Sequence, residues 1–83
     1  MENTIEQFLK GLIDRLTDFD INMLTNETTI EELDLVSLDF VTIKVEAKRN
    51  LGLEIDLNEL AEAEIDNFGE MVRYLEGLYL KGN

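Results

Sequence analysis

Apolar residues recur at intervals of three and four along most of this chain, which is the spacing of one helical face. In the first run, which starts at Thr4, they are Ile5, Phe8, Leu9, Leu12, Leu16 and Phe19. In the last run they are Phe68, Met71, Val72, Leu75, Leu78 and Tyr79. We therefore expect a helix near each end of the chain, the later one capped by Asp66 or Asn67 and ending near Lys81 and Gly82.

A third run, between Ser37 and Leu51, carries two apolar stripes. One consists of Phe40, Ile43, Ala47 and Leu51, and the other of Leu38, Val41 and Val45. Since one stripe suffices for packing, the second makes the apolar surface wider than a simple amphipathic helix needs, and burial in the core can account for it. Ser37 is the only serine in the chain, and we expect its hydroxyl to cap this helix. Gly52 is expected to end it.

The segment between the first two helices, residues 18–36, has no sustained periodicity, so we expect a long first loop. One short turn of helix within it is expected to be capped by Thr28 or Thr29. Apolar residues that can anchor the loop to the core are spaced along it: Ile21, Leu24, Ile30, Leu33 and Leu35.

A short helix is expected between the last two long ones. Asp56 can cap it over residues 57–62, with Leu60 and Ala61 facing inward. The predicted fold is therefore all-α, a small antiparallel bundle of three main helices plus one short helix. Met1 and the short polar tail favour a free-standing protein, with residues 1–83 as a single domain.

The stretch TTIEELDLVSLDFV, followed by NLGLEI, resembles the acyl carrier protein family. The positions in register with that family's signature are Thr28, Ile30, Glu32, Leu33, Ser37, Leu38, Asp39, Val41, Ile43, Gly52, Glu54 and Ile55. The resemblance implies that Ser37 carries a covalent 4'-phosphopantetheine arm, derived from coenzyme A, whose thiol holds an acyl group as a thioester. It also implies delivery of that group to enzymes of fatty-acid, polyketide or related lipid biosynthesis.

The resemblance extends to residues that contact partners and cargo. Those expected to dock partner enzymes are Leu38, Asp39, Val41, Val45, Lys48 and Arg49. Those expected to line a pocket for the acyl chain are Phe40, Ile43, Ala47, Ile55, Phe68, Met71 and Leu75. The implied partners are a phosphopantetheinyl transferase and acyl-transferring and condensing enzymes with basic docking patches.

Several positions depart from the family pattern. Asp34 stands where the family usually has glycine, and Val36 where it has the aspartate that helps the modifying enzyme to recognise its target. Lys48 and Arg49 occupy positions that are usually acidic, which suggests a specialised partner. Two alternatives stay open: an unmodified helical interaction module, and an aminoacyl or peptidyl carrier, although the usual Gly-Gly before the serine region is missing.

The composition excludes several classes of function. The chain has no cysteine and no histidine, which removes disulfides, the usual Cys/His zinc sites, and the Ser-His-Asp and Cys-His arrangements that activate a nucleophile. No EF-hand spacing accompanies the acidic residues, so no metal site is expected. We therefore expect a protein that is not an enzyme.

The charge is strongly acidic, with 19 acidic residues against seven basic ones and a formal net charge of −12. Nucleic acids and anionic membranes attract cationic surfaces, so neither is an expected partner. The chain also shows neither a secretory signal nor an apolar run of membrane-spanning length. We expect a cytoplasmic monomer.

Overall fold

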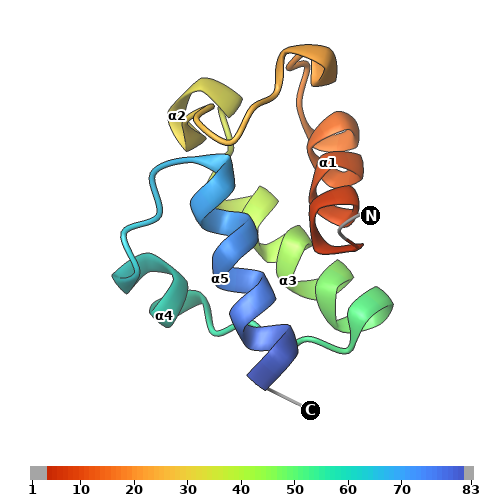
Figure 1. Cartoon of the computed structure of the whole chain (residues 1–83), viewed down its shortest axis with the longest axis vertical. Helices are drawn as coiled ribbons and strands as arrows, with labels where there is room; N and C mark the ends of the chain where they lie inside the picture. Colours follow the sequence, from red (N-terminus) through yellow and green to blue (C-terminus); the bar gives the residue numbers. More distant parts are fainter. Residues whose placement is uncertain (1–3, 82–83) are drawn as a thin grey trace.

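The computed structural model describes residues 4–81, and the expectations that involve Met1 and Gly82 fall outside this range. Within it, five α-helices and one 3-10 helix follow one another along the chain (Figure 1). They are α1 (Thr4–Leu16), η1 (Ile21–Met23), α2 (Ile30–Leu33), α3 (Ser37–Leu51), α4 (Leu57–Glu62) and α5 (Phe68–Lys81). The three main helices and the short helix α4 are confirmed, and α2 is the short turn expected in the long first loop.

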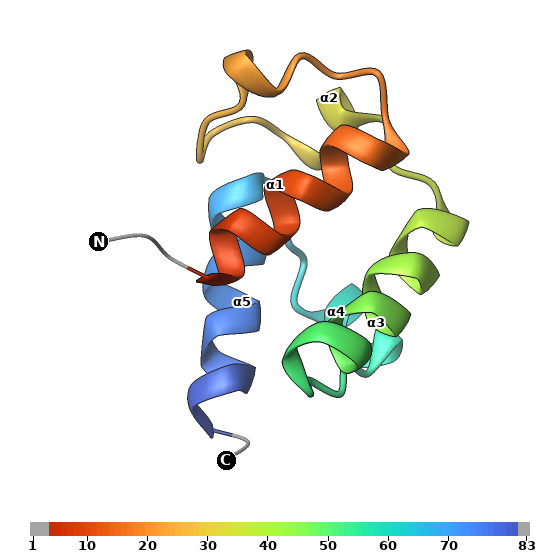
Figure 2. The ribbon, with the colours of Figure 1, turned by 90° about the vertical axis from the view of Figure 1, so that its right-hand side faces the viewer.

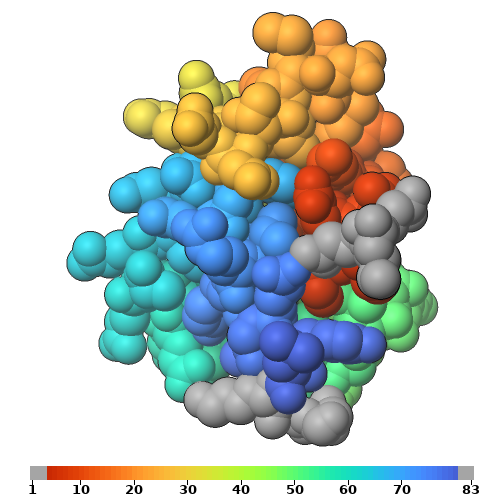
Figure 3. Space-filling view, in the orientation of Figure 1, coloured from red at the N-terminus to blue at the C-terminus, as the bar shows by residue number. Residues whose placement is uncertain are grey.

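The first helix holds the other two long helices together. α1 contacts both α5 and α3, and α3 in turn contacts α4. α1 and α5 are in contact and run in opposite senses, since one rises in Figure 1 while the other descends, and Figure 2 shows that α1 crosses α5 obliquely. On the face shown in Figure 3, α5 forms the surface between α4 and α1. The three long helices thus form the main body of the fold, and the short helices α2 and α4 lie at its edges (Figure 1).

The core follows the apolar periodicity of the sequence. The largest side chains that are fully buried are Phe68, Leu9, Leu33, Ile43 and Leu75. They come from α1, α2, α3 and α5, so every long helix and the short α2 share one hydrophobic cluster. Truncating such a side chain to alanine typically costs about 2–5 kcal/mol of stability.

The long first loop is held in place by local caps. Thr29 is the N-cap of α2: its Oγ1 accepts a hydrogen bond from the N–H of Glu32 at 3.0 Å, and the Glu32 carboxylate accepts one from the N–H of Thr29 at 2.9 Å. Thr28 is buried instead, and its Oγ1 accepts a hydrogen bond from the N–H of Thr25 at 2.9 Å. The two threonines that the sequence left as alternatives therefore have different roles.

The same loop is attached to the start of α5. The N–H of Ile30 donates to the carbonyl of Asp66 at 2.8 Å, and the N–H of Phe68 donates to the carbonyl of Thr28 at 2.8 Å. These bonds surround an isolated antiparallel bridge between Thr29 and Asn67. They fix α2, and with it the segment that leads into α3.

Two expectations were wrong in detail. Phe19 lies beyond the end of α1, because the hydroxyl of Thr17 donates to the carbonyl of Ile13 at 2.9 Å and accepts from the N–H of Phe19 at 3.2 Å, which turns the chain. Phe19 still packs against the core. Ala61 is exposed, whereas its neighbour Leu60 is buried as expected.

Candidate functional site

The start of α3 differs from the expected cap. Val36, not Ser37, is the N-cap, and Ser37 is the first residue of the helix. Val36 has no side-chain acceptor, so the first turn is held by Asp39, whose carboxylate accepts a hydrogen bond from the N–H of Val36 at 3.1 Å. The expectation that the Ser37 hydroxyl caps the helix was therefore wrong, and the hydroxyl is left without a structural role there.

Ser37 is exposed, and its hydroxyl makes no hydrogen bond to any residue in the range 4–81. The N–H groups of Ser37 and Leu38 belong to the first turn of a 15-residue helix and have no acceptor within it. They lie at the positive end of the helix dipole, where a phosphate group is stabilised. A reachable hydroxyl at this position fits the attachment of a phosphate-linked group.

The entry into α3 depends on an unusual backbone conformation at Asp34. This residue ends α2 in the left-handed region, with φ 60° and ψ 37°, and its N–H donates to the carbonyl of Glu31 at 3.0 Å. Glycine adopts this conformation without steric cost, whereas aspartate does so with a modest penalty. The site therefore explains why a glycine is suited to this position, and shows that Asp34 produces the same turn.

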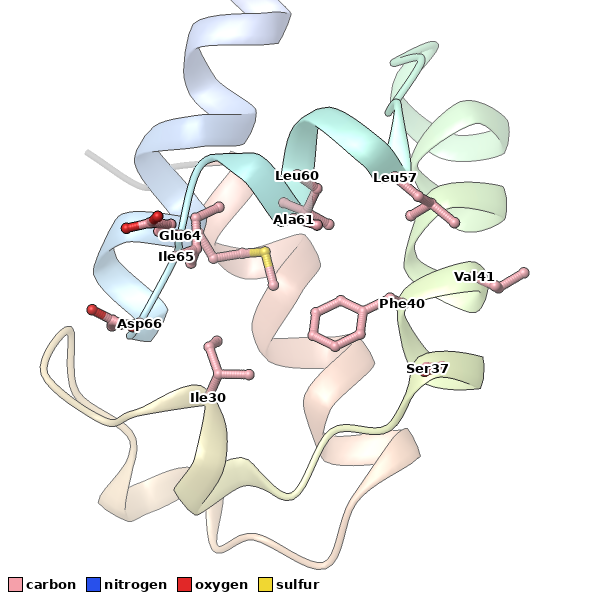
Figure 4. Close-up of a pocket in the computed structure, with 11 residues that line it drawn as sticks. Ile30, Ser37, Phe40, Val41, Leu57, Leu60, Ala61, Glu64, Ile65 and Asp66 are labelled. Carbon is pink, nitrogen blue, oxygen red and sulfur yellow. The ribbon is translucent and has the colours of Figure 1, made fainter.

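A pocket of about 640 Å³ opens beside Ser37 (Figure 4). It lies between α2, α3, α4 and the start of α5, and its lining residues are Ile30, Ser37, Phe40, Val41, Leu57, Leu60, Ala61, Glu64, Ile65, Asp66 and Met71. Figure 4 shows Ile30 and Phe40 pointing into this space from α2 and α3, with Ser37 on the first turn of α3. The walls are mostly apolar, which suits an acyl chain.

Two of the seven residues expected to line an acyl pocket, Phe40 and Met71, lie at this pocket. The other five are buried in the core: Ile43, Ala47, Ile55, Phe68 and Leu75. Sequence reasoning did not assign the walls supplied by α2 and by the stretch from Leu57 to Asp66 to this pocket. In the sequence, two predictions pointed to these walls: Ile30 was expected to anchor the loop to the core, and Leu60 and Ala61 were expected to face inward.

The outer face of α3 carries the residues expected to dock partners. The exposed fractions of Leu38, Val41 and Val45 are 71%, 41% and 54%, so these side chains do not belong to the core. Figure 4 shows Val41 pointing away from the centre of the pocket. Asp39 is half-buried and is engaged at the helix start through its bond to Val36.

The two exposed basic residues at the end of this face, Lys48 and Arg49, form ion pairs at the surface. The Lys48 ammonium lies 2.9 Å from the Glu54 carboxylate, and the Arg49 guanidinium lies 3.8 Å from that of Glu46. The hydrogen bond from Lys48, together with its charge, holds the pKa of the Glu54 carboxyl below its ordinary value. Exposed pairs of this kind contribute little to stability, so both cations remain accessible to a partner.

Residues 4–81 lack the features of two further classes of site, a metal centre and a membrane span. This part of the chain contains no group of three or more acidic side chains arranged to hold a metal ion. None of its helices is both long enough and apolar enough to cross a membrane.

Comparison with known proteins adds one finding. A family model described as "Phosphopantetheine attachment site" matches residues 7–75, which includes Ser37 and every residue of the pocket. Searches of curated proteins and of solved structures found no significant match.

Proposed function

This chain belongs to the phosphopantetheine-attachment family of carrier proteins, and we propose that Ser37 is the residue that receives its prosthetic group. Members of this family carry a covalent 4'-phosphopantetheine and are carriers, not enzymes. When attached, the arm supplies a terminal thiol that holds an acyl group as a thioester. The chain's own residues contribute the attachment point, a docking surface and a sheltered space.

The observation that carries the proposal is the state of the Ser37 hydroxyl. It is the hydroxyl of the chain's only serine, it is exposed, and it has no hydrogen-bond partner among the described residues. Because Asp39 holds the helix start, modification of Ser37 removes no capping interaction. The oxygen can therefore form a phosphodiester bond while a transferase takes up its proton and adenosine 3',5'-bisphosphate leaves coenzyme A.

The proposed role is to present acyl groups to the enzymes of fatty-acid, polyketide or related lipid biosynthesis. A tethered cargo reaches each enzyme at high effective concentration, because one recognised handle replaces repeated bimolecular encounters. The formal net charge of −12 supports steering toward partners whose surfaces carry basic patches away from the place where Lys48 and Arg49 would lie.

We also propose that the pocket beside Ser37 shelters part of the cargo. Ile30, Phe40 and Met71 contribute apolar surface to it, and Ser37 lies on the same wall as Phe40. NMR spectra of the modified protein loaded with an octanoyl or an acetyl group test this. The octanoyl form is expected to shift the methyl signals of Ile30 and Met71 more than the acetyl form, and equal shifts contradict the proposal.

The attachment itself is tested by intact-mass measurement after incubation with coenzyme A and a broad-range phosphopantetheinyl transferase. The wild-type chain is expected to gain one phosphopantetheine. Ser37→Ala is expected to gain none, whereas Thr42→Ala, which removes another hydroxyl of the same helix, keeps the full gain. A wild-type chain that no transferase modifies would support the unmodified interaction module instead.

A further inference from the structure

The outer face of α3 carries an exposed apolar row that lies outside the core, and one of its members, Val41, also lines the pocket beside Ser37. We call Leu38, Val41 and Val45 the α3 stripe; their exposed fractions are 71%, 41% and 54%. They are three and four residues apart, so they lie one above the other along the helix. The residues that α3 contributes to the core are different ones, namely Ile43 and Ala47. Burial within the monomer therefore does not account for the stripe.

A cationic end follows the stripe. Lys48 and Arg49 lie three and four residues beyond Val45, so they flank the row one turn farther on. They are two of only seven basic residues in a chain whose formal net charge is −12. Both cations are exposed, and their pairs with Glu54 and the half-buried Glu46 lie at the surface, where a competing carboxylate can replace them at little cost.

The stripe and its cationic end lie within reach of any enzyme that acts at Ser37. At 1.5 Å per residue, Val45 is about 12 Å and Lys48 about 16 Å along the helix from Ser37. A standard protein interface of about 800 Å² per partner spans such a length. One enzyme surface centred near Ser37 therefore covers all three features.

We infer that the transferase that modifies Ser37 in the protein's own source presents an apolar hollow to the α3 stripe and carboxylates to Lys48 and Arg49. This inference rests on the proposed function and names the chemistry of its partner. It also predicts that a transferase with a uniformly basic docking surface is repelled at this end of α3.

Two other occupants of this surface are less favoured. An anionic membrane attracts Lys48 and Arg49 but repels a chain of net charge −12. A two-fold interface uses the same patch twice, so a second copy adds two more cations to the contact, and neither the α3 stripe nor its cationic end contains a carboxylate to pair with them. Both become outcomes of the test.

The test compares modification kinetics with two purified enzymes, the transferase of the protein's own source and a broad-range transferase chosen for a basic docking surface. The variant is Lys48→Glu/Arg49→Glu. The control is Lys10→Glu/Arg73→Glu, which changes the net charge equally but on α1 and α5. Circular dichroism verifies that both variants fold.

Reversal at Lys48 and Arg49 is expected to lower kcat/KM about tenfold with the enzyme of the same source and to raise it about tenfold with the basic one, through KM in both cases. The control pair is expected to change either value less than about twofold, and the differences shrink in about 1 M salt, where the screening length is about 3 Å. Val45→Asn is expected to raise KM with the enzyme of the same source.

Equal effects from the two charge pairs, or a faster reaction of Lys48→Glu/Arg49→Glu with the enzyme of its own source, overturn the inference. So does binding of the wild-type protein to vesicles of phosphatidylglycerol that Lys48→Glu/Arg49→Glu abolishes, and so does dimerisation that Val45→Asn abolishes. If neither enzyme modifies the wild-type chain, the proposed function itself fails, which is a distinguishable result.

Discussion

The carboxylate of Asp39 accepts a hydrogen bond from the backbone N–H of Val36 at 3.1 Å, and so holds the start of α3 from inside the helix. The N-cap side chain, that of Val36, offers no acceptor in return. The helix therefore begins with one of the two usual side-chain bonds of a capping box. This arrangement leaves Ser37, the next residue, free of any capping role.

A better cap at Val36 should stabilise the protein. Val36→Asn supplies the missing acceptor without a new charge and is expected to raise the free energy of unfolding by about 1 kcal/mol. Val36→Asp adds the same acceptor but places a second carboxylate beside Asp39, so a smaller gain is expected. Urea denaturation followed by circular dichroism measures both. No gain with Val36→Asn would show that the missing cap does not limit the stability of α3.

The left-handed residue Asp34 gives a second stability prediction. At φ 60°, glycine has no steric penalty, aspartate a moderate one and alanine a larger one. Asp34→Gly is expected to raise the free energy of unfolding by up to about 1 kcal/mol, and Asp34→Ala is expected to lower it by a similar amount. Thermal midpoints that fall in the order Asp34→Gly, wild type, Asp34→Ala would confirm this. An Asp34→Ala variant that is more stable than the wild type would contradict it.

Gly69 and Gly77 form a matched pair within α5. A Cβ at Gly69 would lie 2.9 Å from the Cβ of Asn26 and 3.0 Å from its carbonyl oxygen, whereas a Cβ at Gly77 meets nothing within 4 Å. Gly69→Ala is therefore expected to push the first loop from α5 and to cost about 1–3 kcal/mol. Gly77→Ala is expected to gain about 1 kcal/mol, because alanine is the better helix former. Denaturant midpoints that move in the same direction contradict this assignment.

The phenol of Tyr74 gives a prediction about pH. Its hydroxyl is buried without a hydrogen-bond partner in the described residues, and burial, with the charges of Glu59 and Asp56, raises its pKa. Well below the ordinary tyrosine pKa of 10.0, the phenol is protonated in both the folded and the unfolded state. As the pH rises above the ordinary tyrosine value, the unfolded state loses this proton first, so the stability contributed by the protonated phenol is lost.

Tyr74→Phe is accordingly expected to raise the free energy of unfolding by about 1 kcal/mol at neutral pH, because it removes an unsatisfied buried hydroxyl. It should also reduce the loss of stability above pH 10. Tyr79, which is exposed, supplies the control: Tyr79→Phe should leave the neutral-pH stability nearly unchanged. A destabilised Tyr74→Phe would indicate that the hydroxyl has a favourable interaction that this account lacks.

Local signals in the sequence predicted the helices well. The span of α3 and its end at Gly52, which has φ 71°, were confirmed because apolar spacing and a left-handed glycine act within one helix. The start of α4 was confirmed for the same reason, since Asp56 accepts hydrogen bonds from the N–H groups of Asn58 and Glu59. Such interactions span four residues or fewer and need no tertiary information.

The failures arose where two segments meet. Serine is a residue type typical of the N-cap position. Whether Ser37 or Val36 takes that position depends on the turn at Asp34 and on the hydrogen bond to Asp39. The pocket combines walls from α2, α3, α4 and α5, and periodicity within one helix does not reveal which exposed edges face each other. Ala61 illustrates this, since it is exposed and yet lines that pocket.

The central claim is that the Ser37 hydroxyl accepts the phosphopantetheine arm, and the absence of cysteine allows it to be tested directly. Because the chain has no thiol of its own, thiol titration after incubation with coenzyme A, a transferase and removal of excess reagent counts only the attached arm. We predict one thiol per chain for the wild type and for Thr42→Ala, and none for Ser37→Ala. A thiol that persists in Ser37→Ala, or that never forms on the wild-type chain, would contradict the account.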